Sequence, residues 1–346
     1  MIRIEENVPL APLTTIGLGG VARYFLRATA EEDILEGLRF AREKNLPLFI
    51  LGGGSNVVFA DAGFAGLVLQ IGWQGIEETR TDTAVRLSVQ AGESWDGLVE
   101  RCVAAGLAGM ECLSGIPGQV GSVPVQNVGA YGQEVSSLIV KVDTLDCLTG
   151  AGRSFLNTDC QFSYRNSFFK TAAGQRYIIV RVHFILERQT RPQIAYPELK
   201  EKVGSQASPA EVREGVLSLR GRKGMLVGPA YPRSCGSFFL NPILSSEKVH
   251  ELQKQFPALP VYPATDGRSK VSAAFLIEAC GISRGFRQGS SSATVSPLHS
   301  LSLVSEGKSA AELVSLARYV QDTIQKKTGV LLEMEPVVYP TDRFSR

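Results

Sequence analysis

The stretch Cys-Gly-Ser-Phe-Phe-Leu-Asn-Pro at residues 235–242 places Ser237 at the mouth of an apolar run. Such a hydroxyl can cap a strand as a turn residue, or it can be a proton donor held against a dry pocket. Nucleophilic serine chemistry is disfavoured, because the stretch lacks the G-x-S-x-G pattern and the chain has only 3 histidines to serve as a base. Cys235 has no partnered base nearby in the sequence and is interpreted as a small buried residue.

Two loops rich in small residues are candidates for binding a ligand. The first is Gly-Gly-Gly-Ser-Asn at residues 52–56, and the second covers residues 116–132 with four glycines and two prolines. Glycine permits positive φ and lets a ligand approach the main chain, and successive bare N–H groups bind phosphate oxygens. The two loops could together hold a pyrophosphate without a lysine, although simple tight turns also use such glycines.

Familiar nucleotide-binding patterns do not describe these loops. The G-x-x-x-x-G-K-[ST] pattern is absent, and residues 52–57 lack the third glycine of the dinucleotide fingerprint. The length of the second loop favours a functional role, because long loops without regular structure are uncommon.

The elements that must position these loops follow from hydrophobic periodicity and capping signals. Strands are expected at residues 47–51, 66–71, 84–90, 138–147 and 177–187. Helices are expected after capping boxes at Thr29 with Glu32, Ser208 with Glu211 and Ser309 with Glu312, and at residues 95–105, 246–255, 271–280 and 310–327. Strands and helices mix without strict alternation, which predicts an α+β fold.

Composition narrows the class of protein. The chain has 346 residues, enough for two or three domains, and the polar, proline-containing segment at residues 188–209 is the expected boundary. The formal net charge is +2 with no basic run, so neither nucleic acid nor a membrane surface is an expected partner.

The metal-ligating residue types are sparse. The 6 cysteines are scattered without a C-x-x-C pair and the 3 histidines lie apart, so no metal site and no disulfide framework is expected. No apolar stretch is long enough to span a bilayer, and the N-terminus lacks the apolar core of a signal peptide. A cytoplasmic protein is therefore expected.

Five segments in the same order resemble the UDP-N-acetylenolpyruvoylglucosamine reductase family. They are ILGGGSNVV, SGIPGQVGSVPVQNVGAYG, FSYRNSFFK, GSFFLNP and LEMEP. The chain is also similar to the type of this family that has a tyrosine loop over the substrate, since Ile-Ala-Tyr-Pro-Glu-Leu at residues 194–199 corresponds to that loop. It departs from the family pattern at Thr14-Thr15-Ile16 and at Ser290-Ser-Ser292.

The resemblance implies a particular fold and cofactor. It implies a non-covalent FAD in an α+β domain of the vanillyl-alcohol-oxidase type with two subdomains, and a separate α+β substrate domain. The expected ranges are residues 1–200 for the FAD domain, divided at about residue 70, residues 205–335 for the substrate domain, and a tail at residues 336–346.

The implied reaction is reduction of an enolpyruvyl ether by NADPH through FAD in peptidoglycan precursor synthesis. Three residues at family positions would carry it. Ser237 is the expected proton donor, Arg165 the clamp for the substrate carboxylate, and Glu335 the carboxylate near the developing enol. Glu333 is an alternative to Glu335, because LEMEP contains two carboxylates; the register favours Glu335.

The resemblance also implies the binding residues. The expected cofactor contacts are Gly52, Gly53, Gly54, Ser55, Asn56, Val57, Ile116, Pro117, Gly118, Gly121, Ser122, Gln126, Asn127, Gly129, Ala130, Tyr131, Arg165 and Arg220. The expected substrate contacts are Tyr164, Tyr196, Lys223, Asn241, Tyr262, Lys270, Arg284 and His299.

Two other functions are compatible with parts of the sequence. A flavin oxidase or dehydrogenase acting on another small molecule would explain the glycine loops, but not the segments around Arg165, Ser237 and Glu335. A non-catalytic module that binds nucleotide sugars would contain no flavin. A monomer is expected, since no heptad pattern or large apolar stripe indicates assembly.

Overall fold

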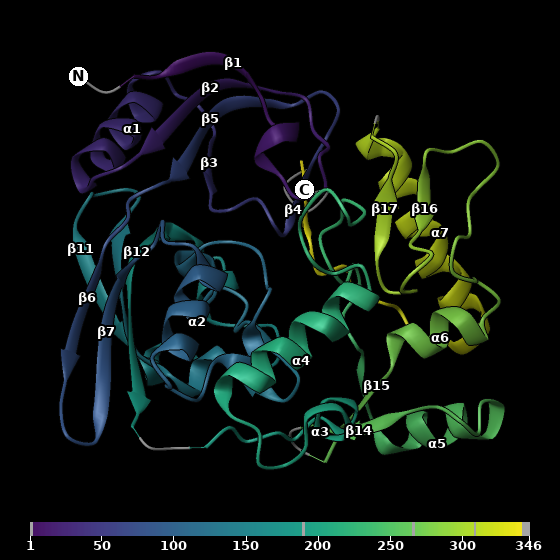
Figure 1. Ribbon diagram of the computed structural model, residues 1–346. Coiled ribbons are helices and arrows are strands. Elements are labelled where there is room, and N and C mark those ends of the chain that lie inside the picture. The colour runs from purple at the N-terminus through teal and green to yellow at the C-terminus, as the bar shows by residue number, and fades with distance from the viewer. Residues whose placement is uncertain (1–2, 189–190, 265–266, 308, 341–346) are drawn as a thin grey trace. The chain divides into compact units, whose positions relative to one another are not determined.

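The computed structural model describes residues 3–188, 191–264, 267–307 and 309–340, and the chain forms two compact units (Figure 1). The first unit comprises Met1–Val8, Ala22–Gly54 and Phe64–Gly221. The second comprises Pro9–Val21, Ser55–Gly63 and Arg222–Arg346. Residues 341–346 of the expected C-terminal tail lie outside the described residues.

The first sheet has the strand order β1-β2-β5-β3. Its strands are β1 (Glu5–Pro9), β2 (Val21–Ala28), β5 (Phe64–Ile71) and β3 (Leu48–Leu51). β2, β5 and β3 run parallel, and α1 (Glu31–Glu43) covers one face of the sheet (Figure 1). Gly37 of α1 permits this packing, because a Cβ there would lie 2.8 Å from Leu26 Cδ2 on β2.

The second sheet is antiparallel, with the order β11-β10-β12-β7-β6. Its strands are β11 (Gly152–Leu156), β10 (Ile139–Asp146), β12 (Tyr177–Glu187), β7 (Ala84–Gln90) and β6 (Ile76–Arg80). Val182 and Phe184 face Val89 and Leu87 in register, and their side chains are buried together with Trp95 of α2 (Trp95–Ala104). The alternating run at residues 84–90 is thus confirmed as a half-buried strand.

Short elements join these sheets to the loops of interest. They are the 3-10 turns Glu111–Leu113, Val120–Ser122, Val135–Ser137, Asn157–Cys160, Phe168–Lys170 and Gly174–Arg176, the strands β8 (Gly129–Ala130) and β9 (Gln133–Glu134), and the helices α3 (Pro197–Val203) and α4 (Pro209–Arg222).

The second unit contains three small sheets. β4 (Val57–Phe59) pairs in parallel with β18 (Val337–Tyr339), β15 (Ser269–Val271) lies between β13 (Ile243–Leu244) and β14 (Val261–Pro263), and β16 (Ala293–Val295) pairs with β17 (Leu303–Ser305). Its helices are the 3-10 turn Ala11–Leu13, α5 (Ser246–Gln255), α6 (Ala273–Ala279) and α7 (Ala310–Thr328). Phe238 and Phe239 lie in the apolar core shared by α6 and α7.

The division of the chain differs from the expected boundary between residues 200 and 205. α4 belongs to the first unit, because Val212, Val216 and Leu219 bury their side chains with Cys112. Two earlier segments join the second unit, since Ile16, Leu18 and Val58 lie in the core that contains Phe238. Such interleaving depends on tertiary packing, which local composition does not encode.

Two of the expected capping boxes differ in their carboxylate partner. At α1 the box uses Asp33 instead of Glu32, and Asp33 accepts hydrogen bonds from the N–H groups of Thr29 and Ala30. At α7, Ser309 Oγ accepts from the Glu312 N–H as expected, but the Glu312 carboxylate accepts from the N–H of Ser292 instead of returning to the cap. The Ser208 box is confirmed in both directions.

Asp61 replaces the missing carboxylate at the start of α7. Its Oδ1 accepts from the Ala310 N–H at 2.7 Å, and its Oδ2 accepts from the Ala311 N–H at 3.2 Å and from Ser309 Oγ at 2.9 Å. Burial opposes ionisation of this carboxyl, but these three donors outweigh it and lower the pKa of Asp61. The charge also complements the positive end of the helix dipole.

We therefore expect Asp61→Ala to lower the free energy of unfolding at pH 7 by about 1–2 kcal/mol, the usual cost of a lost cap. Because the folded-state pKa lies below the unfolded-state value, this contribution is complete above the ordinary aspartate pKa and disappears as the pH falls through the folded-state value. Urea denaturation of both proteins from pH 7 downwards tests this. Asp322→Ala, on an exposed position of the same helix, is the control, and an equal effect of the two substitutions would contradict the capping role.

Candidate active site

Within the first unit, the glycines of the first loop pack closely against the second loop. A Cβ on Gly53 would lie 2.7 Å from Gly118 Cα, and a Cβ on Gly52 would overlap Ser122 Oγ. The sequence after β3 therefore needs bare glycines at both positions, since a side chain would separate the loops. This contact brings together residues that lie more than sixty positions apart in the sequence.

Several residues of these loops have left-handed backbone conformations. Gly54 and Gly118 have φ of 65° and 120°, and the non-glycine residues Asn127 and Tyr131 have φ of 43° and 49°. This conformation costs free energy for a non-glycine residue, and residues that adopt it are concentrated at functional sites. This backbone strain, which the sequence does not reveal, supports a ligand-binding role for the second loop.

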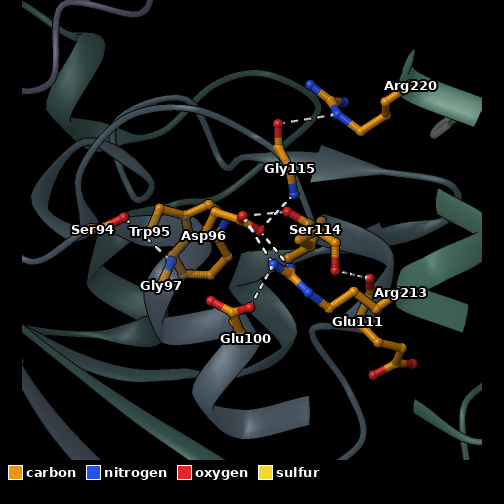
Figure 2. Close-up of polar contacts among 11 residues, drawn as sticks. Ser94, Trp95, Asp96, Gly97, Glu100, Glu111, Ser114, Gly115, Arg213 and Arg220 are labelled. Carbon is orange, nitrogen blue, oxygen red and sulfur yellow. Dashed lines mark hydrogen bonds and ion pairs between the residues drawn. The ribbon is translucent and has the colours of Figure 1, made fainter. Parts of the chain in front are cut away.

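Polar side chains hold the peptide groups of Gly115, just before the second loop, on both sides (Figure 2). Asp96 Oδ1 accepts from the Gly115 N–H at 2.6 Å, while Arg220 Nε donates to the Gly115 carbonyl at 3.2 Å. Asp96 also accepts two hydrogen bonds from Arg213, at 2.6 Å and 3.0 Å. The turn at Gly115, with φ of 69°, is therefore tied to α2 through Asp96 and to α4 through both arginines.

The charges of this cluster are partly withdrawn from water. Burial lowers the pKa of Arg220, opposed by the nearby Tyr131 and Asp96, and only 9% of this residue is exposed. Burial also opposes ionisation of Asp96, but the hydrogen bonds from Arg213 and Gly115 outweigh it, so the pKa of Asp96 is lowered. An arginine remains charged even when buried, so Arg220 brings a positive charge to the glycine loop.

The loop that carries Arg165 is joined to the second glycine loop by three side-chain hydrogen bonds. Ser167 Oγ donates to the Val125 carbonyl at 2.6 Å, Asn127 Nδ2 donates to the Ser163 carbonyl at 3.1 Å, and Arg165 donates to the Gly129 carbonyl. The expected clamp and the expected cofactor loop thus form one assembly within the first unit.

Arg165 itself has a strained backbone, with φ of 51°. Lys170 Nζ donates to its carbonyl at 3.1 Å, and its guanidinium lies 5.3 Å from the ring centroid of Tyr164. Gly129 must lack a side chain, since a Cβ there would lie 2.8 Å from the Gln133 carbonyl oxygen and 3.1 Å from Arg165 Nη1. The arginine is therefore held in position at its backbone and at its head group.

Asn127 is a structural link as well as an expected cofactor residue. It is 1% exposed, and its amide also bonds to the Glu134 carboxylate at 2.8 Å and to the Ser136 N–H at 3.1 Å. Its side chain is thus committed to protein partners, which leaves its backbone as the part that can meet a ligand.

The expected substrate tyrosine packs against the expected cofactor loop. The rings of Tyr196 and Tyr131 meet edge to face, with centroids 5.2 Å apart. Burial raises the pKa of both hydroxyls, that of Tyr131 to about 12. Both groups are therefore neutral hydrogen-bonding phenols at physiological pH.

Ser237 lies in the second unit after a glycine that faces open space. Gly236 has φ of 74°, and a Cβ there would meet nothing within 4 Å. Upstream, Thr15 Oγ1 donates to the Ser234 carbonyl at 2.8 Å, and Ser234 Oγ accepts from the Gly236 N–H at 3.2 Å. Downstream, the Phe238 N–H donates to the Leu301 carbonyl at 2.7 Å. The half-buried serine is thus anchored on both sides of an open backbone position.

Glu335 lies on the segment that runs beside Ser237, next to the isolated β-bridge between Met334 and Phe239. Its N–H donates to the Phe238 carbonyl at 2.9 Å, and its charge contributes to the raised pKa of Cys235. Glu333 is exposed, whereas Glu335 is half-buried, which favours Glu335 as the functional carboxylate. Burial is the larger cause that raises the pKa of Cys235 to about 12, so this thiol is not a nucleophile.

The other expected substrate residues of the second unit form two groups at opposite ends of α6. Tyr262 and Lys270 are cross-strand partners on β14 and β15, and Asn241 Oδ1 accepts from the Ala273 N–H at the start of α6. Near the end of the helix, Arg284 Nε donates to Glu278 at 2.9 Å, and the charges of Arg284 and His299 both help to lower the pKa of Glu278 against the effect of burial.

The remaining expected residues take their places from the elements already given. In the first unit, Ile116, Pro117, Gly121, Gln126 and Ala130 follow the path of the second loop. In the second unit, Ser55, Asn56 and Val57 enter β4, Asn56 Nδ2 donates to the Glu335 carbonyl at 3.2 Å, and Lys223 follows α4. Their contacts with ligands stay predictions.

The sequence interpretation missed Asp96, Arg213 and Lys170. Asp96 follows the capping serine Ser94 at the start of α2, and Arg213 precedes Arg220 by two helical turns on α4, so their spacing was available as a signal. Lys170, the third missed residue, lies in the same segment as Arg165.

Within the described ranges, no cluster of three or more histidine, cysteine or acidic residues could hold a metal ion, and no helix is long and apolar enough to cross a membrane.

Two family models match the chain. The FAD binding domain matches residues 22–155, and the C-terminal domain of UDP-N-acetylenolpyruvoylglucosamine reductase matches residues 228–339. A reductase of that name from Thermobifida fusca is 43% identical over 96% of this chain and 97% of its own length. One from Pseudomonas syringae pv. syringae is 37% identical over 98% and 99%.

A solved structure is similar over nearly the whole chain. It is the crystal structure of UDP-N-acetylenolpyruvylglucosamine reductase from Thermus caldophilus, with 26% identity and a TM-score of 0.66, covering 98% of this chain and 100% of that one. The matched domain and the fold define an FAD-dependent oxidoreductase, which excludes the non-catalytic binding module. The chain belongs to the UDP-N-acetylenolpyruvoylglucosamine reductase family. The expected α+β fold, with an FAD-binding domain and a separate C-terminal domain, is confirmed.

The residues of the first unit fit this cofactor. FAD carries a pyrophosphate, and the glycine loops contain left-handed turns at which a ligand can approach the backbone, with the Arg220 side chain at Gly115, just before the second loop. The matched FAD-binding region, residues 22–155, contains both loops.

We expect Asp96→Asn to weaken FAD binding by about tenfold, because the neutral amide loses the charge-assisted bonds that hold Arg213 and the Gly115 turn. Titration of apoprotein with FAD, followed by flavin fluorescence, measures the dissociation constant. Glu100→Gln is the matched control, since Glu100 lies on the same helix 3.9 Å from Arg213 but is 71% exposed. Equal dissociation constants of FAD for Asp96→Asn and wild type would refute the role of Asp96 in holding the Gly115 turn for the cofactor.

Proposed function

We propose that this enzyme reduces the enolpyruvyl group of UDP-N-acetylenolpyruvoylglucosamine to the lactyl ether of UDP-N-acetylmuramate, with NADPH as the source of electrons. The observation that carries the proposal is the anchored Ser237 beside the open Gly236, with Glu335 on the neighbouring segment, where its N–H donates to the Phe238 carbonyl. Bound FAD would pass a hydride from NADPH to the terminal carbon of the substrate double bond.

Arg165 would bind and polarise the substrate carboxylate. Hydride addition places negative charge on the carbon next to that carboxylate, and the charge spreads into it as an enolate. The planar guanidinium pairs with a carboxylate through two parallel hydrogen bonds. The hydrogen bonds of Arg165 to the Gly129 carbonyl and of Lys170 to the Arg165 carbonyl hold this residue in place, which would reduce the reorganisation needed when charge develops.

Ser237 would deliver the proton to the carbanion. A serine hydroxyl is a weak acid, but a carbanion is a strong base, so position matters more than acidity. The half-buried serine is followed by Phe238 and Phe239, both buried in the core, which supports a local environment poor in water. Glu335 would orient the enol or share its proton.

The uridine diphosphate sugar would contact cationic and hydrogen-bonding side chains. Lys223, Lys270 and Arg284 offer cations for the diphosphate, and Asn241 and Tyr262 offer hydrogen-bonding groups. Tyr164 and Tyr196 would cover the sugar and the enolpyruvyl group, with Tyr196 acting as the substrate-covering tyrosine. His299 completes the proposed set. A monomeric state and a cytoplasmic location belong to the same proposal.

We expect Ser237→Ala to leave flavin reduction by NADPH within about twofold of wild type and to slow reoxidation by the enolpyruvyl substrate by about 10²–10⁴-fold, the usual contribution of a positioned acid. Anaerobic stopped-flow absorbance resolves the two half-reactions. Ser283→Ala, at an exposed serine of the second unit, serves as the control. Equal losses in both half-reactions would show that Ser237 is structural, and no loss in either would remove it from the mechanism.

A further inference from the structure

α3 and α4 cross in close contact at Gly215. A Cβ on this residue would overlap Val203 Cγ1 and would lie 3.1 Å from Leu199 Cδ1, both on α3. Valine in a helix has one strongly preferred rotamer, so Val203 cannot turn aside at low cost. Leu199 is fully buried in the apolar cluster with Val212, Val216 and Leu219 of α4. The missing side chain of Gly215 therefore sets the distance between the two helices.

Of the two helices, α4 is the fixed partner. It has 14 residues, and it is anchored by the paired hydrogen bonds from Arg213 to Asp96 and by the bond from Arg220 to the Gly115 carbonyl (Figure 2). α3 has 7 residues, of which Leu199 is the buried one. Any added volume at the crossing will consequently displace α3 rather than α4.

Tyr196 is directly joined to α3. It is the N-cap residue of the helix, followed by Pro197 at the first helical position, so its backbone moves with the helix. Its ring rests edge-on against Tyr131 of the second glycine loop, 5.2 Å between centroids. A shift of α3 therefore changes the direction in which the Tyr196 hydroxyl points.

We propose that Gly215 is a positioning residue for substrate binding: the close α3–α4 crossing that it permits holds Tyr196 at the height where its hydroxyl meets the substrate. The inference rests on the proposed role of Tyr196 and extends it to residues that do not touch a ligand. Small displacements of positioning groups are costly, because binding and catalysis depend on geometry within about 1 Å.

The test is a double-mutant cycle at the crossing. Gly215→Ala adds volume from one side and is expected to raise KM for UDP-N-acetylenolpyruvoylglucosamine about five- to tenfold, with kcat and FAD affinity within about twofold of wild type. Val203→Ala removes volume from the other side and is expected to raise KM about two- to threefold. The double variant, which restores the fit, should have a lower KM than either single variant.

Gly37→Ala is the matched control. Gly37 is also a helical glycine under close contact, with a Cβ position 2.8 Å from Leu26 Cδ2, but it lies on α1 against the first sheet. It is expected to lower the thermal midpoint without changing KM. If Gly215→Ala fails to fold, the Val203→Ala and double variants still decide, since the predicted KM of the double variant lies below that of Val203→Ala.

Tyr196→Ala separates the two levels of the proposal. If Tyr196→Ala raises KM and the cycle at the crossing does not, the positioning role of Gly215 is wrong while the proposed function stands. If Tyr196→Ala leaves KM unchanged, the role of Tyr196 and the inference built on it both fail. Additive KM effects at Gly215 and Val203 would also overturn the inference.

Discussion

The close approach of Gly53 to Gly118 is the constraint on which the cofactor site depends. A Cβ on Gly53 would lie 2.7 Å from Gly118 Cα, so the two loops can meet only as bare backbone. Their contact brings the main chains of the two glycine loops side by side after β3, where the glycines let a ligand approach the backbone. We propose that the buried Arg220, whose Nε donates to the Gly115 carbonyl from α4, supplies positive charge for the FAD pyrophosphate.

Side-chain hydrogen bonds connect other segments of the first unit to the second glycine loop and to Gly115 just before it. Ser167, Asn127 and Arg165 join the arginine loop to residues 125–129, and Asp96 with Arg213 joins α2 and α4 to Gly115. The expected carboxylate clamp is therefore positioned by the same backbone that would bind the flavin. In the second unit, the backbone hydrogen bonds of Phe238 to Leu301 and Glu335 hold the segment that carries Ser237 in position.

Local sequence signals predicted much of the fold but few of these hydrogen bonds between distant segments. The strand at residues 84–90 and the helices after Ser208 and Ser309 follow from periodicity and caps, and the structure has them. The family resemblance pointed to Ser237, Arg165 and the glycine loops. Neither source could show that Asp61 caps α7 from 249 residues away, that α4 belongs to the first unit, or that Gly215 sets a helix crossing. Those features arise from tertiary contacts between segments with no local sign of their partners.

The central claim, that FAD lies against both glycine loops, is tested most directly by amide hydrogen exchange of the apoprotein before and after addition of FAD. Amides that bind phosphate or are covered by the cofactor exchange more slowly, so the account predicts protection at residues 52–56 and 115–131. Protection confined to other segments, with exchange in these two loops unchanged by FAD, would contradict it.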